Sequence, residues 1–379
     1  TTMRKIKIAL VTRSLTRGGV QVQIVNFARE LKRRGHQVSV IVFYDHGPLQ
    51  AQLESDGVPV LVLGNRGRWN LIATLFRYLA IAQSEEFDVI YSFLPLQNLL
   101  SLVVARLTGA TVVWGLRCAA VDTRQHGWAS RFLYWAQRRL IFSPDHVISN
   151  SRAAIDELGC QPGDHFTVIP NGIDIHRFKP DPVIRSAMRK ELGIADSEKL
   201  VGCVARIDSM KDHATALRAA AIVRSRRRDI RFAVVGSGDA KYCKSLNELA
   251  TQLGLGDAIA WYGERPDVER VMNALDAYTS ASVAEGFSNA LGEAMACGVI
   301  PAVTDAGDNA ALVGEHGTVV PMRSPERLAD AIVASIDRDT PAARNERRNW
   351  IVQKFSVDRM VDASLQTLAI ASLSTHSCE

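Results

Sequence analysis

The sequence predicts an α/β protein built from two doubly wound parallel sheets, and three observations predict this fold. The chain has 379 residues, more than one hydrophobic core usually holds. Apolar, strand-like runs alternate with amphipathic, helix-like stretches along the chain, which is typical of parallel sheets covered by helices. The alternation breaks once, at the Gly-, Pro- and charge-containing segment 171–182, which indicates a linker between two domains.

The same alternation occurs before and after this linker. Strands are expected where short apolar runs precede polar loops, and helices where apolar residues recur every three or four positions. Before the linker, the expected strands lie within 6–15, 36–44, 87–93, 110–116, 146–151 and 166–174, and the helices within 20–35, 68–85, 96–109 and 129–144. After it, the strands lie within 200–206, 230–238, 259–263, 277–282, 300–305 and 317–321, and the helices within 212–226, 240–254, 265–276 and from Ala290.

Domain boundaries follow from this alternation. We expect a first domain over 3–174, a linker over 175–182 and a second domain over 183–354. The last apolar-periodic stretch predicts a terminal helix over 355–374.

The two halves differ in charge. Residues 1–180 carry 21 Lys and Arg against 13 Asp and Glu, a net +8, whereas residues 181–379 carry 24 against 27, a net −3. The basic half is suited to phosphates, anionic lipid or nucleic acid, and charge alone does not choose among them.

Composition also excludes some classes of protein. The six cysteines are scattered without a CxxC pair or neighbouring paired histidines, so neither a zinc site nor a disulfide framework is predicted. No uncharged run approaches the ~20 residues of a membrane-spanning helix, and no signal-peptide pattern is visible. We therefore expect a cytoplasmic protein.

Doubly wound sheets bind ligands beyond the carboxyl ends of their strands, so a cleft between two such domains is the expected site. Two cations, Arg206 and Lys211, lie between a strand and a helix at this edge. A guanidinium and an ammonium at that spacing can both reach one diphosphate, although two solvated loop cations would look the same.

Two glycine pairs lie at the same edge. Gly18 and Gly19 follow the first strand, where backbone amides can approach a phosphate or simply form a turn. Gly236 and Gly238 form a G-x-G pair without a third glycine. The missing third glycine weakens the interpretation as a dinucleotide site.

The segment AEGFSNALGEAMACG (284–298) carries two carboxylates eight positions apart. Asn289 is the expected N-cap of a helix that holds Glu293 in its first two turns, where an acid also suits the helix dipole. Glu285 precedes the helix on a strand-end loop, where the sequence shows no stabilising role for it. The pair is suited to binding a sugar and a ribose.

These motifs together resemble the GT-B-fold, retaining glycosyltransferases of family 4, the group 1 glycosyl transferases of bacterial polysaccharide and glycolipid synthesis. The resemblance spans nearly the whole chain. It is carried by RGG after the first strand, VISNSRAAIDELG, VIPNGIDIHRFKP, the Arg-x4-Lys of ARIDSMK, VVGSGD and, most specifically, the E-x7-E of EGFSNALGEAMACG.

The resemblance implies two Rossmann-like domains that face each other across a cleft, with the terminal helix 355–374 crossing back to the first. Arg206 and Lys211 would bind the donor diphosphate, Glu293 the ribose, and Glu285 the donor sugar. The remaining expected donor-binding positions supply backbone contacts: Gly18, Gly19, Gly236, Gly286, Phe287, Ser288 and Asn289.

The resemblance also implies the chemistry. Transfer from a nucleotide-diphosphate sugar, with UDP favoured over GDP, would proceed with retention and without a metal or cofactor. Cationic groups would stabilise the leaving phosphate, which itself accepts the acceptor's proton.

The first domain departs from the family in one loop. Many relatives carry a histidine near WGLRCAAVD, where this chain has Arg117, Cys118 and Asp122. Arg117 would stabilise charge and Asp122 would meet the acceptor hydroxyl, or both are ordinary loop residues.

The acceptor is expected to be a glycan or a lipid-linked glycan precursor. The segment 65–82 combines an apolar stripe with Arg66, Arg68, Trp69, Phe76, Arg77 and Tyr78, so it either rests on an anionic membrane or packs on the sheet. Peripheral contact with a membrane is therefore one expectation.

Three alternatives remain open from the sequence. A GT-B-fold sugar-nucleotide epimerase would act on the donor alone. A dehydrogenase would bind NAD(H), and a nucleic-acid- or membrane-binding module would not need Glu285 and Glu293.

Overall fold

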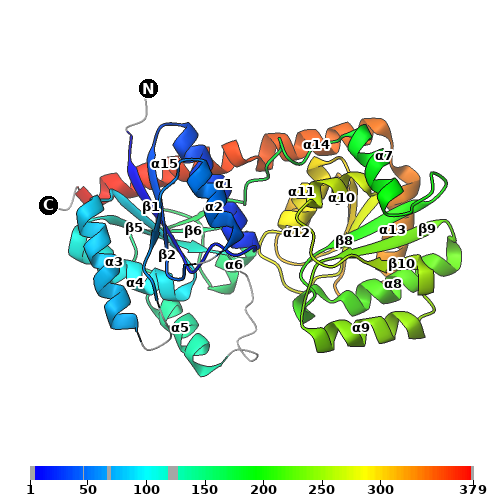
Figure 1. The fold of residues 1–379 in the computed structure, drawn as a ribbon, viewed down its shortest axis with the longest axis horizontal. Coiled ribbons are helices and arrows are strands. Elements are labelled where there is room, and N and C mark those ends of the chain that lie inside the picture. Colours follow the sequence, from blue (N-terminus) through cyan, green and yellow to red (C-terminus); the bar gives the residue numbers. More distant parts are fainter. Residues whose placement is uncertain (1–4, 46, 66–69, 118–126, 377–379) are drawn as a thin grey trace. The chain divides into compact units, whose positions relative to one another are not determined.

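A computed structural model of the chain describes residues 5–45, 47–65, 70–117 and 127–376 (Figure 1). The chain forms two compact units, one of Thr1–Gly172 with Val357–Glu379 and one of Ile173–Ser356. Each unit contains one parallel sheet, with seven strands in the first and six in the second. The predicted α/β fold class is confirmed.

The first unit orders its strands β3-β2-β1-β4-β5-β6-β7. Their bounds are β1 (Lys7–Thr12), β2 (Gln37–Val42), β3 (Val60–Val62), β4 (Val89–Phe93), β5 (Thr111–Leu116), β6 (His146–Ser149) and β7 (Phe166–Val168). Runs such as KIALVT and TVVWGL are apolar nearly throughout because helices cover both faces of the sheet.

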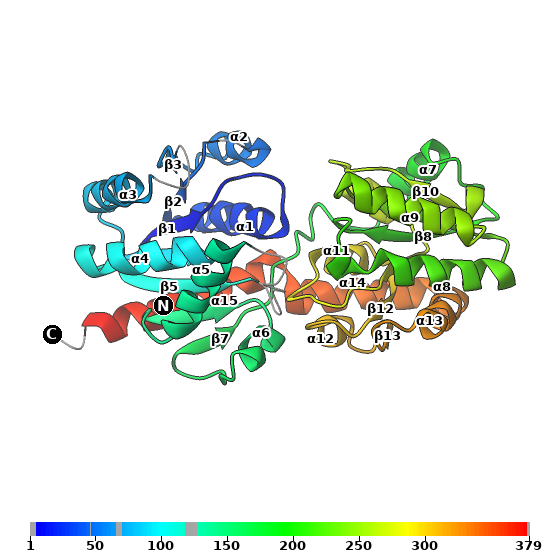
Figure 2. The same ribbon diagram turned by 90° about the horizontal axis from the view of Figure 1, so that it is seen from below.

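Helices form two layers on this sheet. One face packs against α1 (Gly19–Arg33), α2 (Pro48–Ser55) and α15 (Val357–His376). The other face packs against α3 (Leu71–Glu85) and α4 (Pro95–Thr108). Beside α4 lies α5 (Trp128–Arg139), so that α4 separates α3 from α5 (Figure 2). The short α6 (Arg152–Glu157) follows β6.

The terminal helix α15 packs on the first unit. Its residues Met360, Val361, Leu365 and Leu368 are buried in the core beneath α1. On the rim, the Arg34 guanidinium binds the carboxylates of Asp358 and Asp362. The helix begins at Val357, two residues later than predicted, because residues up to Phe355 continue α14 and Ser356 is extended.

The second unit orders its strands β10-β9-β8-β11-β12-β13. The strand bounds are β8 (Lys199–Val204), β9 (Ile230–Val235), β10 (Ile259–Trp261), β11 (Ala277–Ser280), β12 (Ile300–Thr304) and β13 (Thr318–Val320). One face packs against α7 (Pro182–Glu191), α10 (Val268–Ala274), α11 (Asn289–Ala296), α12 (Asn309–Val313) and α14 (Pro341–Phe355). The other packs against α8 (His213–Arg226), α9 (Ala240–Gln252) and α13 (Pro325–Arg338).

Several elements lie where no helix or strand was predicted. These are α2, β3, α6, α7, α12, α13 and α14, most of which are short or lie next to a Pro-containing turn. The second unit begins at Ile173, and α7 begins at Pro182, the last residue of the predicted linker.

Each sheet has a switch point in its strand order. In the first sheet the chain passes from β1 through β2 to β3 and then returns to β4 on the other side of β1. In the second, it passes from β8 through β9 to β10 and returns to β11. Loops at such points diverge and leave a ligand-binding crevice at the carboxyl ends of the strands. Among the described helices, none combines the length and apolar character needed to cross a bilayer.

Candidate functional site

The predicted donor-binding side chains meet at the switch point of the second sheet. Arg206 and Lys211 lie in the loop that follows β8, and Glu285 lies in the loop that follows β11. The two strands are hydrogen-bonded neighbours, so their carboxyl ends emerge side by side.

Lys211 and Glu285 form an ion pair across this point. Lys211 Nζ lies 2.5 Å from Glu285 Oε1, and the two side chains are 19% and 9% exposed. Ser282 Oγ donates to the same oxygen at 2.7 Å. Glu285 therefore has a stabilising role that its position in the sequence did not indicate, since its carboxylate neutralises Lys211. An ammonium has three N–H donors, so Lys211 can bind Glu285 and an anionic ligand together.

Acidic side chains of the loop that carries Lys211 hold its backbone by hydrogen bonds. The Asp208 side chain accepts from the backbone N–H groups of Met210 and Lys211, which closes the short 3-10 helix η2 (Ser209–Lys211). Asp212 then caps α8 by accepting from the Thr215 N–H at 3.2 Å. These caps order the backbone around the lysine.

Arg206 stands at the open end of the same loop. Its side chain is 73% exposed, and its guanidinium lies 3.1 Å from the Asp208 carboxylate. His213 Nε2 donates to the Arg206 carbonyl oxygen at 3.1 Å from beneath. Burial lowers the pKa of His213, which favours the neutral ring. The backbone of Arg206 is thus fixed while its side chain extends into solvent.

The Gly236–Gly238 loop lies directly against the β8 loop. A Cβ on Gly236 would lie 1.9 Å from the Ala205 carbonyl oxygen, and one on Gly238 would lie 1.9 Å from that of Ile207. The Ile207 N–H donates to the Ser237 carbonyl at 2.8 Å. Glycine is required here by close backbone approach, and the structure brings Gly236 beside Arg206.

The turn 286–289 enters α11 differently from the prediction. The helix begins at Asn289 itself, with Ser288 in the cap position and no side-chain capping bond, so the prediction of Asn289 as the N-cap is wrong. Phe287 is buried and packs against Phe355 with ring centroids 5.7 Å apart. The Phe287 ring therefore holds the turn in place. Only the backbone groups of Phe287 are then available to a ligand.

A second turn supports this one, and the sequence analysis missed it. Gly307 has φ +57°, and a Cβ there would lie 2.3 Å from the Glu285 carbonyl oxygen. The neighbouring Asp308 N–H donates to the Gly286 carbonyl at 3.1 Å. The only sequence signal was a glycine before an aspartate, which indicates a turn but not which loop it contacts.

Glu293 lies in the middle of α11 and is partly buried. Burial raises its pKa to about 7, while the charge of Arg177 acts in the opposite direction. Arg177 is itself engaged by Glu269 at 2.7 Å. Among the described residues, no hydrogen bond to the Glu293 carboxylate is present. A carboxylate in this state is a candidate ligand-binding group.

In the first unit, Gly18 is the N-cap of α1 and Gly19 its first residue. Gly18 has φ −168°, an extended backbone that any residue adopts. A Cβ there would meet only the flexible side chain of Gln21. The helix terminus follows β1, at the switch point of the first sheet.

Arg117 follows β5 and is held on three sides. Its guanidinium donates to Asn171 Oδ1 at 2.8 Å and to the Tyr91 hydroxyl at 2.9 Å, and it lies 4.8 Å from the Phe93 ring centroid. Its Nε is buried without a partner among the described residues. Asp122, predicted to act with it, lies outside the described residues.

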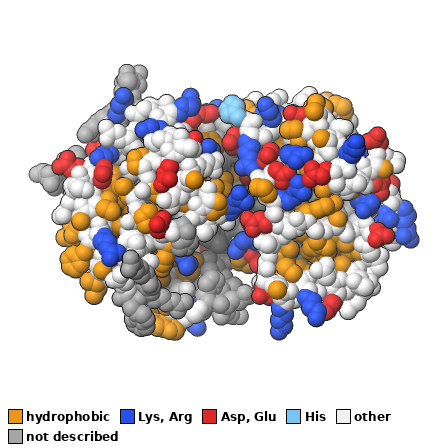
Figure 3. Space-filling model, in the orientation of Figure 1, with side chains coloured by type: hydrophobic (Ala, Val, Ile, Leu, Met, Phe, Trp, Pro, Cys, Tyr) orange, Lys and Arg blue, Asp and Glu red, His pale blue; other side chains and the backbone are white. Residues whose placement is uncertain are grey.

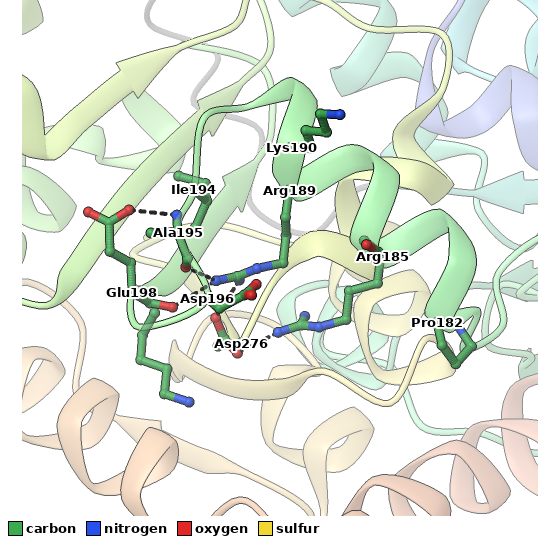
Figure 4. Close-up of a pocket in the computed structure, with 11 residues that line it drawn as sticks. Pro182, Arg185, Arg189, Lys190, Ile194, Ala195, Asp196, Glu198 and Asp276 are labelled. Atoms are coloured by element: carbon green, nitrogen blue, oxygen red, sulfur yellow. Dashed lines mark hydrogen bonds and ion pairs between the residues drawn. The ribbon is translucent and has the colours of Figure 1, made fainter.

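A cavity also lies elsewhere in the second unit, at the amino ends of β8 and β11 (Figure 4). Its volume is about 480 Å³. Arg185 and Arg189 converge there on the Asp276 carboxylate at 2.7 and 2.9 Å and tie α7 to the sheet. Because ligands of this fold bind at the opposite edge, we assign these residues to structure. Across the described residues, no cluster of three or more potential metal ligands is found.

Two families match the chain, one to each unit. The family described as glycosyl transferase 4-like domain matches residues 18–172, and the family described as glycosyl transferases group 1 matches residues 184–354. One match lies within the predicted first domain, 3–174, and the other within the predicted second domain, 183–354.

Individual relatives agree with these families. A D-inositol 3-phosphate glycosyltransferase of Geodermatophilus obscurus is 26% identical, over 94% of this chain and 85% of its own. The lipopolysaccharide core biosynthesis mannosyltransferase LpsB of Rhizobium meliloti is 30% identical, over 58% of this chain and 61% of its own. The crystal structure of HepE of Anabaena with UDP and glucose has 24% identity and a TM-score of 0.82, over 96% of this chain and 99% of its own.

Proposed function

The chain belongs to the group 1 glycosyltransferases, and from this membership we propose a specific reaction for it. It transfers a hexose or N-acetylhexosamine from a nucleotide-diphosphate sugar, with UDP favoured over GDP, to a hydroxyl of a glycan or lipid-linked acceptor. Transfer proceeds with retention at the anomeric carbon and needs neither metal nor cofactor. The observation that carries this proposal is the Lys211–Glu285 pair at the switch point of the second sheet.

The second unit binds the donor in this reaction. Lys211 and Arg206 contact the diphosphate, and the Arg206 side chain is exposed enough to swing from Asp208 to a phosphate. Glu293 accepts hydrogen bonds from the ribose diol, while Glu285 orients both Lys211 and the donor sugar. Backbone amides of the turn 286–289 and of the Gly236 loop complete the contacts.

The chemical step is a substitution at the anomeric carbon. The bond from that carbon to the phosphate oxygen breaks, a bond to the acceptor oxygen forms on the same face, and the leaving phosphate takes the acceptor's proton. Negative charge grows on the departing diphosphate, where fixed cations stabilise it more than they stabilise the ground state. Lys211 and Arg206 supply the positive charge that a metal ion supplies in other transferases.

The first unit binds the acceptor. Gly18 and Gly19 present the start of α1 to the donor phosphates, and Arg117 adds positive charge beyond β5. Asp122 meets the acceptor hydroxyl. For a lipid-linked acceptor, the enzyme works in the cytoplasm against the inner face of a membrane.

Calorimetry with UDP, GDP, ADP and NAD⁺ tests the donor assignment. We expect UDP to bind most tightly and Lys211→Met to weaken it by about tenfold or more, as expected for the loss of a charge-assisted bond. Arg327→Met, at an exposed position on α13, is the matched control and leaves binding unchanged. If GDP bound most tightly, the donor would be a GDP-sugar instead of a UDP-sugar. Binding of NAD⁺ alone would overturn the proposal.

Incubation with the donor alone separates transfer from epimerisation. A transferase leaves the sugar configuration unchanged without an acceptor, whereas an epimerase converts the donor. Relatives include GDP-mannose-dependent mannosyltransferases, and the HepE structures contain UDP, UDP-glucose or UDP with glucose. The first incubations therefore use UDP-glucose and GDP-mannose.

A further inference from the structure

Helix α5 carries its large apolar side chains on the side that faces solvent. None of its residues is buried. Trp128, Phe132 and Trp135 are 81%, 56% and 55% exposed, at i, i+4 and i+7 spacing along one stripe of the helix. The residues between them on the opposite side, such as Leu133 and Gln137, are partly covered, which shows that the helix lies on the unit with its aromatic side outward.

The same outward stripe carries all the charge of the helix. Arg131, Arg138 and Arg139 lie at the spacings that place them among the aromatic residues, and all three are exposed. The Arg139 guanidinium lies 5.8 Å from the Trp135 ring centroid, and Trp135 stacks on Phe132 at 5.7 Å. The segment 127–142 contains no Asp or Glu. We call Trp128, Arg131, Phe132, Trp135, Arg138 and Arg139 the α5 stripe.

Neighbouring helices extend the exposed apolar area. Ile72 and Phe76 on α3 are 74% and 65% exposed, and Leu107 on α4 is 60% exposed. Figure 3 shows hydrophobic side chains gathered over the outer helices of the first unit, at the lower left of this view. Of the residues singled out in 65–82, Tyr78 is fully buried against Ser101, as expected if the helix packs on the sheet, and it takes no part in this surface. Arg77 binds the carbonyl oxygens of Leu63 and Gly64. Arg66, Arg68 and Trp69 lie outside the described residues.

We propose that the α5 stripe docks the first unit onto an anionic lipid surface. This rests on the proposed function, in which the acceptor is lipid-linked. Tryptophan is enriched at the membrane interface because its ring is apolar and its N–H is polar. The arginines bind anionic headgroups while their stems lie along apolar surface. An outward stripe of aromatic and cationic residues without acids is complementary to such a surface in both polarity and charge.

A protein partner is the competing occupant. A second copy of this chain would bring its own α5 stripe, with three more arginines and no acid, so the like charges would repel each other. The charge of the stripe therefore favours lipid over self-association.

The experiment is sedimentation of the full chain with vesicles. Vesicles of phosphatidylcholine alone are compared with vesicles that also contain phosphatidylglycerol, at low and high salt. We expect binding to the anionic vesicles, about fivefold weaker for each arginine replaced, and weakened by salt. Trp128→Ser with Trp135→Ser should lower the partition coefficient by tenfold or more.

Matched controls lie in the second unit. Val183→Ser removes an apolar side chain that is 79% exposed, and Arg327→Ser removes an exposed arginine from α13; both should leave vesicle binding unchanged. Because the α5 substitutions are at exposed positions, they should not shift the thermal midpoint. A second readout is quenching of tryptophan fluorescence by brominated lipid, which the double Trp variant should abolish.

Vesicle binding and donor binding are independent readouts, so the two proposals fail separately. Absence of binding to anionic vesicles, or binding that the α5 variants leave unchanged, overturns the docking proposal even where UDP binds. A dimer that the Trp variants dissociate, without vesicle binding, assigns the stripe to a second copy instead. Failure of UDP binding with intact vesicle binding overturns the donor assignment alone.

Discussion

The two units share a reversal of strand order in their sheets, but different residues lie at the two reversals. Both sheets reverse direction beside their first strand, at β1–β4 and at β8–β11. In the second unit the reversal carries an opposed lysine and glutamate, and each of their loops is packed closely against a glycine of a neighbouring loop. In the first it carries a helix terminus, and the nearby charged residue, Arg117, is engaged by Asn171 and Tyr91.

The shared fold therefore supplies a crevice, and specific residues supply the chemistry. A nucleotide diphosphate is the same in every donor of its class, so the unit that binds it needs closely fixed groups. In the proposed function the first unit binds the acceptor, which varies among enzymes of this kind, and its outer helix α5 exposes aromatic and basic residues. The following predictions test this division.

The largest effect is expected at the Lys211–Glu285 pair. Lys211→Met should lower kcat/KM by ~10²–10³-fold, because it removes a cation from the leaving diphosphate. It should also destabilise the second unit by about 3 kcal/mol, because the Glu285 carboxylate is left largely buried without its partner. Steady-state kinetics and thermal unfolding measure the two effects separately.

The double variant Lys211→Met with Glu285→Gln is the decisive control. It removes both charges, so stability should return while activity stays lost. Recovery of activity together with stability would show that the pair is only structural, and the contrast between the two switch points would disappear.

A smaller effect is expected at the glycines. Gly236→Ala should weaken UDP binding by about tenfold, because the new Cβ meets the Ala205 carbonyl at 1.9 Å and displaces the loop that carries Arg206. Gly254→Ala is the matched control: its φ is +66° but nothing lies within 4 Å of a Cβ. It should cost about 1 kcal/mol of stability from backbone strain alone, without a change in UDP affinity.

Gly18→Ala extends the same measurement to the first unit. Its backbone is extended and only a flexible side chain is close, so UDP affinity should change by less than about twofold, within the range of a cap substitution. A loss as large as that of Gly236→Ala would mean that both units fix the phosphates equally tightly.

The sequence predicted the fold well because apolar periodicity reports burial, and long buried strands and helices repeat it many times. The elements without a prediction are short, such as β3 and α6, or amphipathic with a weak pattern, such as α14. Their placement depends on contacts with distant segments, which local propensity does not encode.

The sequence predicted which residues belong to the site, but not which of them contact each other. Loop position at strand ends placed Arg206, Lys211 and Glu285 at one edge, but nothing in the spacing indicated that Lys211 pairs with Glu285. The contacts of Ser282, His213 and Gly307 join segments that are remote in sequence or hidden in ordinary turns. A single sequence does not specify such tertiary contacts.

A last contrast is between two glutamates, one in each unit: Glu30, which is buried, and Glu293, which is partly buried. In the first unit, burial alone would raise the pKa of Glu30, but hydrogen bonds from Arg33 and Arg34 outweigh it and lower the pKa to about 2. In the second unit, burial raises the pKa of Glu293 to about 7. Both start from an ordinary value of 4.5, so their contributions to stability change with pH in opposite directions.

The signs follow from which state binds the proton more tightly. Glu30 stabilises the fold above pH 4.5, and this contribution is lost as the pH falls towards 2. For Glu293 the folded state holds its proton longer than the unfolded chain, so stability falls as the pH rises from 4.5 to about 7, by roughly 3 kcal/mol. Glu293→Gln should remove this fall and still weaken UDP binding, as measured by unfolding and calorimetry between pH 4 and 8. A carboxylate such as Glu293, which lowers stability at neutral pH, is expected to serve ligand binding. The control Glu30→Gln should lose stability at neutral pH and leave UDP affinity unchanged. If Glu293→Gln left UDP affinity unchanged instead, Glu293 would have no part in the donor site.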